Sequence, residues 1–272
     1  MVRTAVIFTG QDRNLSRNIK LLRQNLLEAN SVTLFVAVET TFYEFLRHFD
    51  GIEIGGADVR HELFRNAEEL KLFNHMMHRS DRPALRDEVY KRSESEGWNT
   101  YYVTEGSGTI TQYYQVWKAW MLLLEYEQKH NMTFDVVVRC RTDSLLTEKL
   151  DVSAVLSSDE ITCRSLGSEK IRRGLTPTGE STDKAVVTLG YEQFWVAKRD
   201  VFALLATIIL TYGYWDHGDK YAFNSEANFR AFCKMNHLSY WPFTIANMFN
   251  QNHPGSGEVL EDPDVFSLLR NV

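Results

Sequence analysis

The sequence predicts an α/β fold with a mostly parallel central sheet flanked by helices. A strand at residues 3–9, a helix at 15–28 and a second strand at 32–38 follow one another with short connections, which is the βαβ arrangement of parallel sheets. Residues 134–138 contain three consecutive valines, which is typical of a central strand covered on both faces. Together these patterns favour an open sheet with helices on both sides.

The composition suits one large domain. The chain has 272 residues, of which 44% are apolar and 12% aromatic, so it can bury a large core, and we expect a single domain over residues 1–272. The net charge of −6 argues against a general nucleic-acid binder, because binding a duplex needs a positive surface that neutralises phosphates. A local basic cluster can still bind a small anion.

The cysteines and apolar runs indicate a soluble, cytoplasmic protein without a membrane span. Cys140, Cys163 and Cys233 lie too far apart for a zinc spacing or a disulfide framework, so we expect reduced, buried thiols. The apolar run at the N-terminus is short and β-branched, which favours a strand over a signal peptide. The longest apolar run, residues 201–210, is about half of what a bilayer requires.

The other elements of the first half follow from periodicity and turn residues. We expect a helix at residues 41–49 and a short apolar segment at 52–54 that ends in a Gly-Gly turn. Residues 78–100 are rich in charge and breakers, which predicts a mobile insertion. The strongest helix, at 113–130, has a broad apolar face and leads into the strand that begins at residue 134.

The second half alternates loops with shorter elements. Residues 145–156 are predicted as mixed structure, and residues 167–183 as a loop with three glycines and a proline. The predicted strands lie at 161–164, 186–189 and 194–197, the predicted helices at 198–211 and 224–235, and a turn dense in aromatics and acids at 212–219.

Three polar residues stand at the end of the valine-rich strand. Arg139 and Arg141 supply forked donors for phosphate oxygens, and the Asp143 carboxylate offers hard oxygens to a divalent cation. Ligands of open α/β sheets bind at the carboxyl ends of the strands, so this cluster predicts a nucleotide-diphosphate site. The structural alternative is a strand end at which Asp143 pairs only with an arginine.

A second candidate site follows the first strand. Thr9, Gly10, Gln11 and Arg13 lie where that strand turns into a helix, so backbone N–H groups and the Arg13 guanidinium could receive a nucleotide ring or a phosphate. The stretch is neither G-x-G-x-x-G nor a P-loop, and the alternative is an ordinary turn between a strand and a helix.

Loop histidines, aromatics and carboxylates in the second half add further candidates. His217 and His253 could act as additional metal ligands, although a solvated loop histidine is the common case. Aromatic residues at 191–195 and 212–215 could stack on sugar faces, although most will be core. Four carboxylates could act as a catalytic base, namely Asp219, Glu226, Asp216 and Glu192.

The order of these motifs resembles that of a GT-A glycosyltransferase. The motifs are the G-Q-x-R turn after the first strand, the W-K-A-W helix, F-D-V-V-V-R-C-R-T-D, Y-E-Q-F-W-V-A-K-R-D-V-F and N-S-E-A-N-F-R-A-F. The resemblance covers residues 4 to about 232. It is closest to small soluble transferases, of the kind found in bacteria and large DNA viruses, in which a hydrophobic strand ends in R-x-R-x-D.

The resemblance implies a GT-A-like fold of Rossmann type that transfers a monosaccharide from a nucleotide diphosphate-sugar, UDP- or GDP-linked, to a glycan acceptor hydroxyl. Residues 1–144 would bind the donor, with its base and ribose near Thr9 to Arg13, and residues 145–272 would bind the carbohydrate acceptor. Asp143 would stand at the acidic motif that binds Mn²⁺ or Mg²⁺, with His253 as a further candidate ligand. Arg141 replaces the first acid of the usual D-x-D.

Two mechanistic questions and two rival functions stay open. An inverting enzyme needs one of the four carboxylates to deprotonate the acceptor, whereas a retaining enzyme does not. The rivals are a nucleotide-sugar-binding protein without turnover and a nucleotidyltransferase or phosphotransferase on a similar sheet. Release of pyrophosphate or ADP from a triphosphate would select the last of these.

Overall fold

The structure is a computed structural model that describes residues 2–12, 15–70, 109–144, 146, 149–152, 185–189, 194–211 and 225–242. Seven strands of this part of the chain form one sheet. Their bounds are β1 (Thr4–Gln11), β2 (Thr33–Glu39), β3 (Glu53–Arg60), β4 (Val136–Arg141), β5 (Ala185–Leu189), β6 (Phe194–Lys198) and β7 (Ser239–Pro242).

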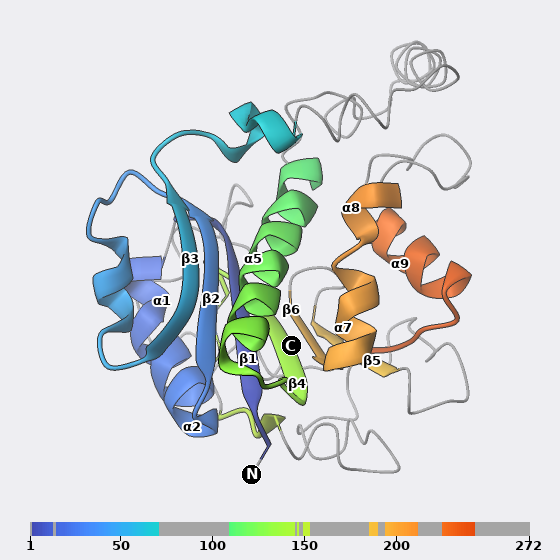
Figure 1. Ribbon diagram of the computed structural model, residues 1–272, viewed down its shortest axis with the longest axis horizontal. Coiled ribbons are helices and arrows are strands. Elements are labelled where there is room, and N and C mark those ends of the chain that lie inside the picture. Colours follow the sequence, from blue (N-terminus) through green and yellow to red (C-terminus); the bar gives the residue numbers. More distant parts are fainter. Residues whose placement is uncertain are drawn as a thin grey trace, which may run out of the picture.

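The sheet is mostly parallel, as predicted. Its strand order is β3-β2-β1-β4-β6-β5-β7, and β6 alone among these described strands runs against its neighbours β4 and β5. The pairs β1/β2, β1/β4, β2/β3 and β5/β7 are all parallel. The α/β class is therefore confirmed, and the carboxyl ends of β1 to β4 lie at one edge of the sheet (Figure 1).

Helices cover both faces of the sheet (Figure 1). One face packs against α1 (Leu15–Leu22), which continues into the π-helical turn η1 (Arg23–Leu27) and α2 (Glu28–Asn30). The other face packs against α5 (Thr109–His130), α7 (Arg199–Leu205), α8 (Ile208–Thr211) and α9 (Ser225–Met235). Short 3₁₀ turns, η2 (Phe45–Phe49) and η3 (Phe64–Asn66), flank β3.

The direction of winding changes between β1 and β4. The chain leaves β1 through α1 on one face and builds β2 and β3 on one side of β1. It then returns through α5 on the opposite face to place β4 on the other side of β1. This is a topological switch point, and in open α/β sheets ligands bind outside the carboxyl ends of the two strands that flank it.

An ion pair joins α5 to the amino end of β4. The buried Glu127 carboxylate accepts a hydrogen bond from the Phe134 N–H at 3.0 Å and two from the Arg199 guanidinium at 3.2 and 2.7 Å. The N–H of Arg199 donates to the Asp135 carbonyl at 3.1 Å. Glu127 therefore holds the end of α5, the start of β4 and the start of α7 together.

The Gly-Gly turn predicted after residue 54 is wrong, because Gly55 and Gly56 lie inside β3. A Cβ on Gly55 would lie 2.5 Å from the Phe35 ring, and one on Gly56 would lie 2.9 Å from Leu122 Cβ. The glycines thus leave room for the Phe35 ring of the neighbouring strand β2 and for Leu122 of α5, and close approach of this kind is a known role of glycine within strands.

Other element bounds also differ from the predictions. The helix predicted at 41–49 is reduced to the 3₁₀ turn η2, and the one predicted at 198–211 divides into α7 and α8. α5 begins at Thr109, four residues earlier than expected, and the short strand β7 was not predicted at all. The predicted insertion at 78–100, the strand at 161–164 and the loop at 167–183 lie outside the described residues.

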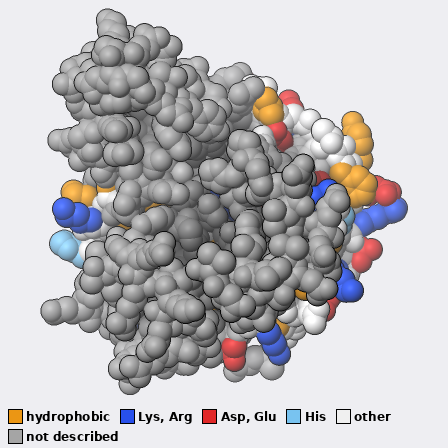
Figure 2. Space-filling view, turned by 180° about the vertical axis from the view of Figure 1, so that it is seen from behind, with side chains coloured by type: hydrophobic (Ala, Val, Ile, Leu, Met, Phe, Trp, Pro, Cys, Tyr) orange, Lys and Arg blue, Asp and Glu red, His pale blue; other side chains and the backbone are white. Residues whose placement is uncertain are grey.

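None of the described helices combines the length and hydropathy that a membrane span requires. Viewed from behind, the described residues at the edge of the molecule show acidic and basic side chains interspersed, not gathered by sign (Figure 2). Two of the cysteines, Cys140 and Cys233, are free and buried, which confirms the prediction for them. Cys163 lies outside the described residues.

The Glu127 ion pair yields a test of the fold. We expect Glu127→Gln to lower the free energy of unfolding by about 2 kcal/mol, because the partly buried Arg199 guanidinium loses its counter-charge and one buried charged hydrogen-bond acceptor is lost. Glu125→Gln, at an exposed position on the same helix, is the matched control and should change stability by about 0.5 kcal/mol or less. Equal urea midpoints for the two variants would contradict this assignment.

Candidate functional site

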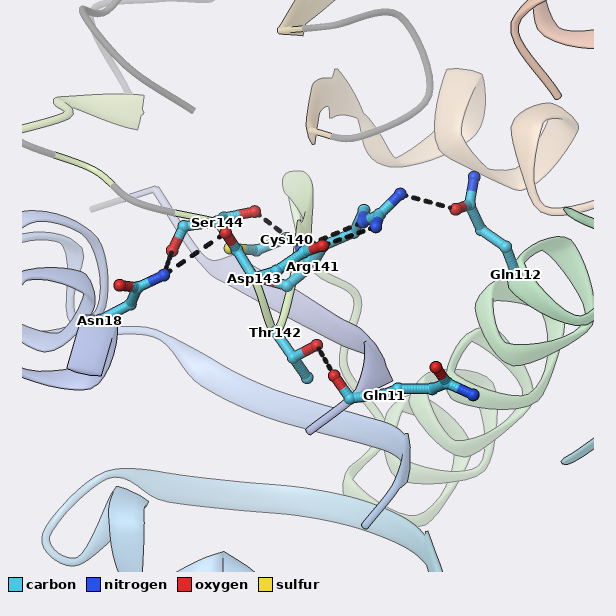
Figure 3. Close-up of polar contacts among 8 residues, drawn as sticks. All are labelled: Gln11, Asn18, Gln112, Cys140, Arg141, Thr142, Asp143 and Ser144. Carbon is cyan, nitrogen blue, oxygen red and sulfur yellow. Dashed lines mark hydrogen bonds and ion pairs between the residues drawn. The ribbon is translucent and has the colours of Figure 1, made fainter. Parts of the chain in front are cut away.

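The carboxyl ends of β1 and β4 approach closely at Gly10. Gly10 has φ +129°, and a Cβ there would lie 2.7 Å from Thr142 Oγ1. Thr142, just after β4, donates its backbone N–H to the Thr9 carbonyl at 3.0 Å and its hydroxyl to the Gln11 carbonyl (Figure 3). Only glycine satisfies both the backbone conformation and the close contact, so the two strand ends meet at this residue.

The Arg141 guanidinium binds the Asp143 carboxylate at this junction (Figure 3). Nε and Nη2 of Arg141 donate to the two carboxylate oxygens of Asp143 at 2.8 and 2.6 Å. Nη1 of Arg141 donates to Oε1 of Gln112, on α5, at 2.9 Å. The Arg141 and Asp143 side chains are 16% and 7% exposed, so water screens this pair less than it screens a surface ion pair.

Hydrogen bonds to its backbone hold the turn that carries Asp143 in place. The N–H of Arg141 donates to Ser144 Oγ at 3.1 Å, and the N–H of Ser144 donates to the Arg141 carbonyl at 3.0 Å. From α1, the Asn18 amide donates to the carbonyls of Asp143 and Ser144 at 3.4 and 3.3 Å. The position of Asp143 therefore depends on both α1 and β4.

Two further asparagines continue this contact along the chain after β4. The Asn25 amide donates to the Leu146 carbonyl at 2.7 Å, and the Asn30 amide donates to the Leu150 carbonyl at 2.7 Å. Asn25 lies in the π-helical turn η1, whose backbone hydrogen bonds run i→i+5, and Asn30 ends the following helix α2. We call Asn18, Asn25 and Asn30 the asparagine row.

Arg139 lies deeper than Arg141 on the same face of β4. It is fully buried, and its guanidinium carbon lies 4.6 Å from the centroid of the Trp195 ring. Trp195 in turn stacks on Phe229 of α9 at 5.3 Å. This cation–π contact places Arg139 within the layer between the sheet and the helices, and its binding of a diphosphate stays a prediction.

The neighbouring strand β2 ends in polar contacts as well. Gln11 donates its side-chain amide to Glu39 Oε1 at 3.1 Å, and the Thr40 hydroxyl donates to Asp12 Oδ2 at 2.9 Å. Gln115, one turn along α5 from Gln112, donates to the Gly10 carbonyl at 3.4 Å. Hydrogen-bonding side chains thus extend along the carboxyl edge from β2 to β4.

A charged cluster lies beside this edge, between β3 and α5. Arg60 donates to both oxygens of Asp58 at 3.0 Å, and Lys118 lies 3.8 Å from Asp58 and 3.6 Å from Glu69. The Tyr114 hydroxyl donates to Glu69 at 2.9 Å. Burial, followed by this hydrogen bond, raises the pKa of Tyr114, so its phenol stays neutral at physiological pH.

The cysteine at the site is not a nucleophile in this state. Burial raises the pKa of the Cys140 thiol to about 12, whereas its contact with Ser144 lowers that pKa to a smaller extent. The reactive form of cysteine is the thiolate. Cys140 therefore packs as a small apolar side chain in the core on the α1 face of the sheet, on the opposite side of β4 from Arg139 and Arg141.

The described residues do not form a ready metal site. Both oxygens of Asp143 accept hydrogen bonds from Arg141, so a cation would have to use the remaining lone pairs of the carboxylate beside a guanidinium of like charge. Among the residues that the structure describes, no three His, Cys, Asp or Glu side chains are grouped to hold a metal. The predicted Mn²⁺ or Mg²⁺ stays a prediction, and we assign no chemical step to it.

The structure brings together five of the predicted site residues, namely Thr9, Gly10, Gln11, Arg141 and Asp143. The structure also shows the alternative for Asp143, an ion pair with an arginine, which is Arg141. Glu226 belongs to the first turn of α9, where only its backbone is described. The other candidates lie outside the described residues, namely Arg13, Glu192, Asp216, Asp219, His217 and His253.

Sequence reasoning missed Gln112, Gln115 and Asn18. The signal for the two glutamines is their spacing of three residues on the otherwise apolar face of α5, where Gln115 is only 2% exposed. A polar side chain on a buried helix face needs a partner, and the partners here are Arg141 and the Gly10 carbonyl. Asn18 carries no comparable signal, because asparagine is common on helix surfaces.

Comparison with known proteins gives no match for this chain, either among protein-family models or among curated proteins.

The contact at Gly10 can be tested through stability. We expect Gly10→Ala to lower the free energy of unfolding by about 3 kcal/mol, because it combines a strained φ with the clash against Thr142. Gly51→Ala is the matched control, since Gly51 has φ +82° and no atom within 4 Å of an added Cβ. It should cost about 1 kcal/mol from backbone strain alone, and equal losses in chemical denaturation would show that the close contact is unimportant.

Proposed function

We propose that the protein is a glycosyltransferase of GT-A-like fold that moves a monosaccharide from a nucleotide diphosphate-sugar to an acceptor hydroxyl. One observation carries the proposal: the predicted donor-binding residues of β1 and β4 meet at the switch point of a mostly parallel sheet, where α/β proteins bind ligands. The mostly parallel sheet with helices on both faces is also what the GT-A resemblance implies.

Arg141 is the residue to which we assign the leaving group. During transfer the bond between the anomeric carbon and the diphosphate oxygen breaks, and its electron pair goes to the diphosphate. A guanidinium that is held in place before the reaction stabilises this developing charge without further reorganisation. Arg141 meets that requirement, because Asp143 and Gln112 hold its three nitrogens at hydrogen-bonding distance.

The acceptor hydroxyl forms the new bond to the anomeric carbon and gives up its proton. We take Glu226 as the first candidate base, because the backbone carbonyl of its neighbour Ser225 accepts a hydrogen bond from the Tyr113 hydroxyl at 2.7 Å. Tyr113 follows Gln112 on α5, so the first turn of α9 lies near the residues that hold Arg141. Asp219, Asp216 and Glu192 remain alternative bases.

The pairing of Asp143 with Arg141 favours a second function. Since Arg141 occupies both of its carboxylate oxygens, the same site suits a protein that binds a nucleotide-sugar without turnover. Product formation separates the two proposals: a transferase releases the nucleoside diphosphate in the presence of an acceptor, and a binding protein does not.

The donor site can be tested with Arg141→Lys. A lysine keeps the charge but loses the planar fork, so we expect binding of the matching nucleotide-sugar to weaken by about tenfold or more. The donor is first selected by thermal shift against UDP- and GDP-sugars, with and without Mn²⁺, because a ligand of the folded state raises the apparent stability.

Arg199→Lys is the matched control, since Arg199 makes a similar two-bond contact with the Glu127 carboxylate near the opposite, amino end of β4. Each variant is compared with its own unliganded melting temperature, which removes the effect of lost stability. The proposal fails if no nucleotide-sugar binds the wild type, or if Arg199→Lys weakens binding as much as Arg141→Lys does.

A further inference from the structure

Two buried polar atoms beside Arg141 have no hydrogen-bond partner among the described residues. They are Nε2 of Gln112, on α5, and Oγ1 of Thr9, at the end of β1. Thr9 is fully buried and is the register partner of Arg141 in the sheet. Buried polar groups are nearly always hydrogen-bonded, so such atoms indicate a place for a water or a ligand.

The two atoms belong to one region. Paired residues of adjacent strands present their side chains on the same face, so Thr9 and Arg141 both lie on the face that α5 covers. Gln112 reaches Arg141 from that helix through its Oε1 atom. Three elements thus contribute polar side chains to one position at the switch point.

The hydrogen-bond donors of this region suit an anion, while Asp143 balances the charge of Arg141. Arg141 contributes a guanidinium, and Gln112 lies in the first turn of α5, a 22-residue helix whose amino end carries a partial positive charge. The Nε2 atom of Gln112 is a donor only, which matches a phosphoryl oxygen and not a cation. A helix start, a guanidinium and an unused amide donor together favour a phosphate group.

We propose that Gln112 binds the diphosphate of the donor, with Nε2 donating to a phosphoryl oxygen while Oε1 still accepts from Arg141. This inference rests on the proposed function and adds to it a residue that recognises the leaving group. Gln112 then acts twice, because the same amide fixes the guanidinium and contacts its ligand. Thr9 Oγ1 is the neighbouring group that a bound phosphate or water would satisfy.

The test compares two substitutions of equal size. Gln112→Glu keeps an acceptor for Arg141 but replaces the amide donor with a negative charge, whereas Gln112→Met removes both functions without adding charge. We expect Gln112→Glu to weaken binding of inorganic pyrophosphate, UDP and GDP, measured by calorimetry, by at least about tenfold, and Gln112→Met to weaken it by about fivefold. Gln128→Glu, at an exposed position of the same helix, is the control for added charge.

The ranking of the variants by their affinity for these ligands decides the result. If Gln112 only orients Arg141 or holds a buried water, Gln112→Glu will bind these ligands either as tightly as the wild type does or more tightly than Gln112→Met does. Either result overturns the inference, while the proposed function stands. If the wild type binds none of the three ligands and no nucleotide-sugar, the proposed function itself fails. The melting temperature of Gln112→Glu should stay close to that of the wild type, because Arg141 keeps a partner.

Discussion

The close approach of β1 and β4 at Gly10 is the constraint on which the candidate site depends. Because residue 10 lacks a side chain and has a positive φ, Thr142 can bond to both the Thr9 and Gln11 carbonyls. Those bonds set where β4 ends and where its turn begins. Arg141 and Asp143 are thereby placed beside β1, at the point where the winding of the sheet changes direction.

Around this contact, side chains from both faces of the sheet act on one short turn. Gln112 reaches Arg141 from α5, and Asn18 reaches the Asp143 carbonyl from α1. The turn itself is closed by Ser144. Residues of both helix layers therefore hold the same pair of charged residues in place.

The parts of the fold that depend on local pattern could be predicted from sequence, and those that depend on distant contacts could not. β1, β2 and β4 follow from runs of apolar, β-branched residues. Gly55 and Gly56 have the local signature of a turn, and only Phe35 and Leu122 explain why they lie in a strand. The cluster at the carboxyl end of β4 was visible as a motif, but the Arg141–Gln112 contact spans 29 residues and the burial of Arg139 depends on Trp195.

The π-helical turn η1 has a consequence for how the first helix can vary in length. The π-helical hydrogen bonds of η1 span one residue more than those of an α-helix, and Asn25 and Asn30, which lie in and after this turn, both donate to carbonyls beyond β4. Deleting a single residue there would rotate everything after it by roughly 100° about the helix axis. The asparagine row would then lose its match to the Leu146 and Leu150 carbonyls, so natural variants of this segment should tolerate exchange of residue types far better than gain or loss of a residue.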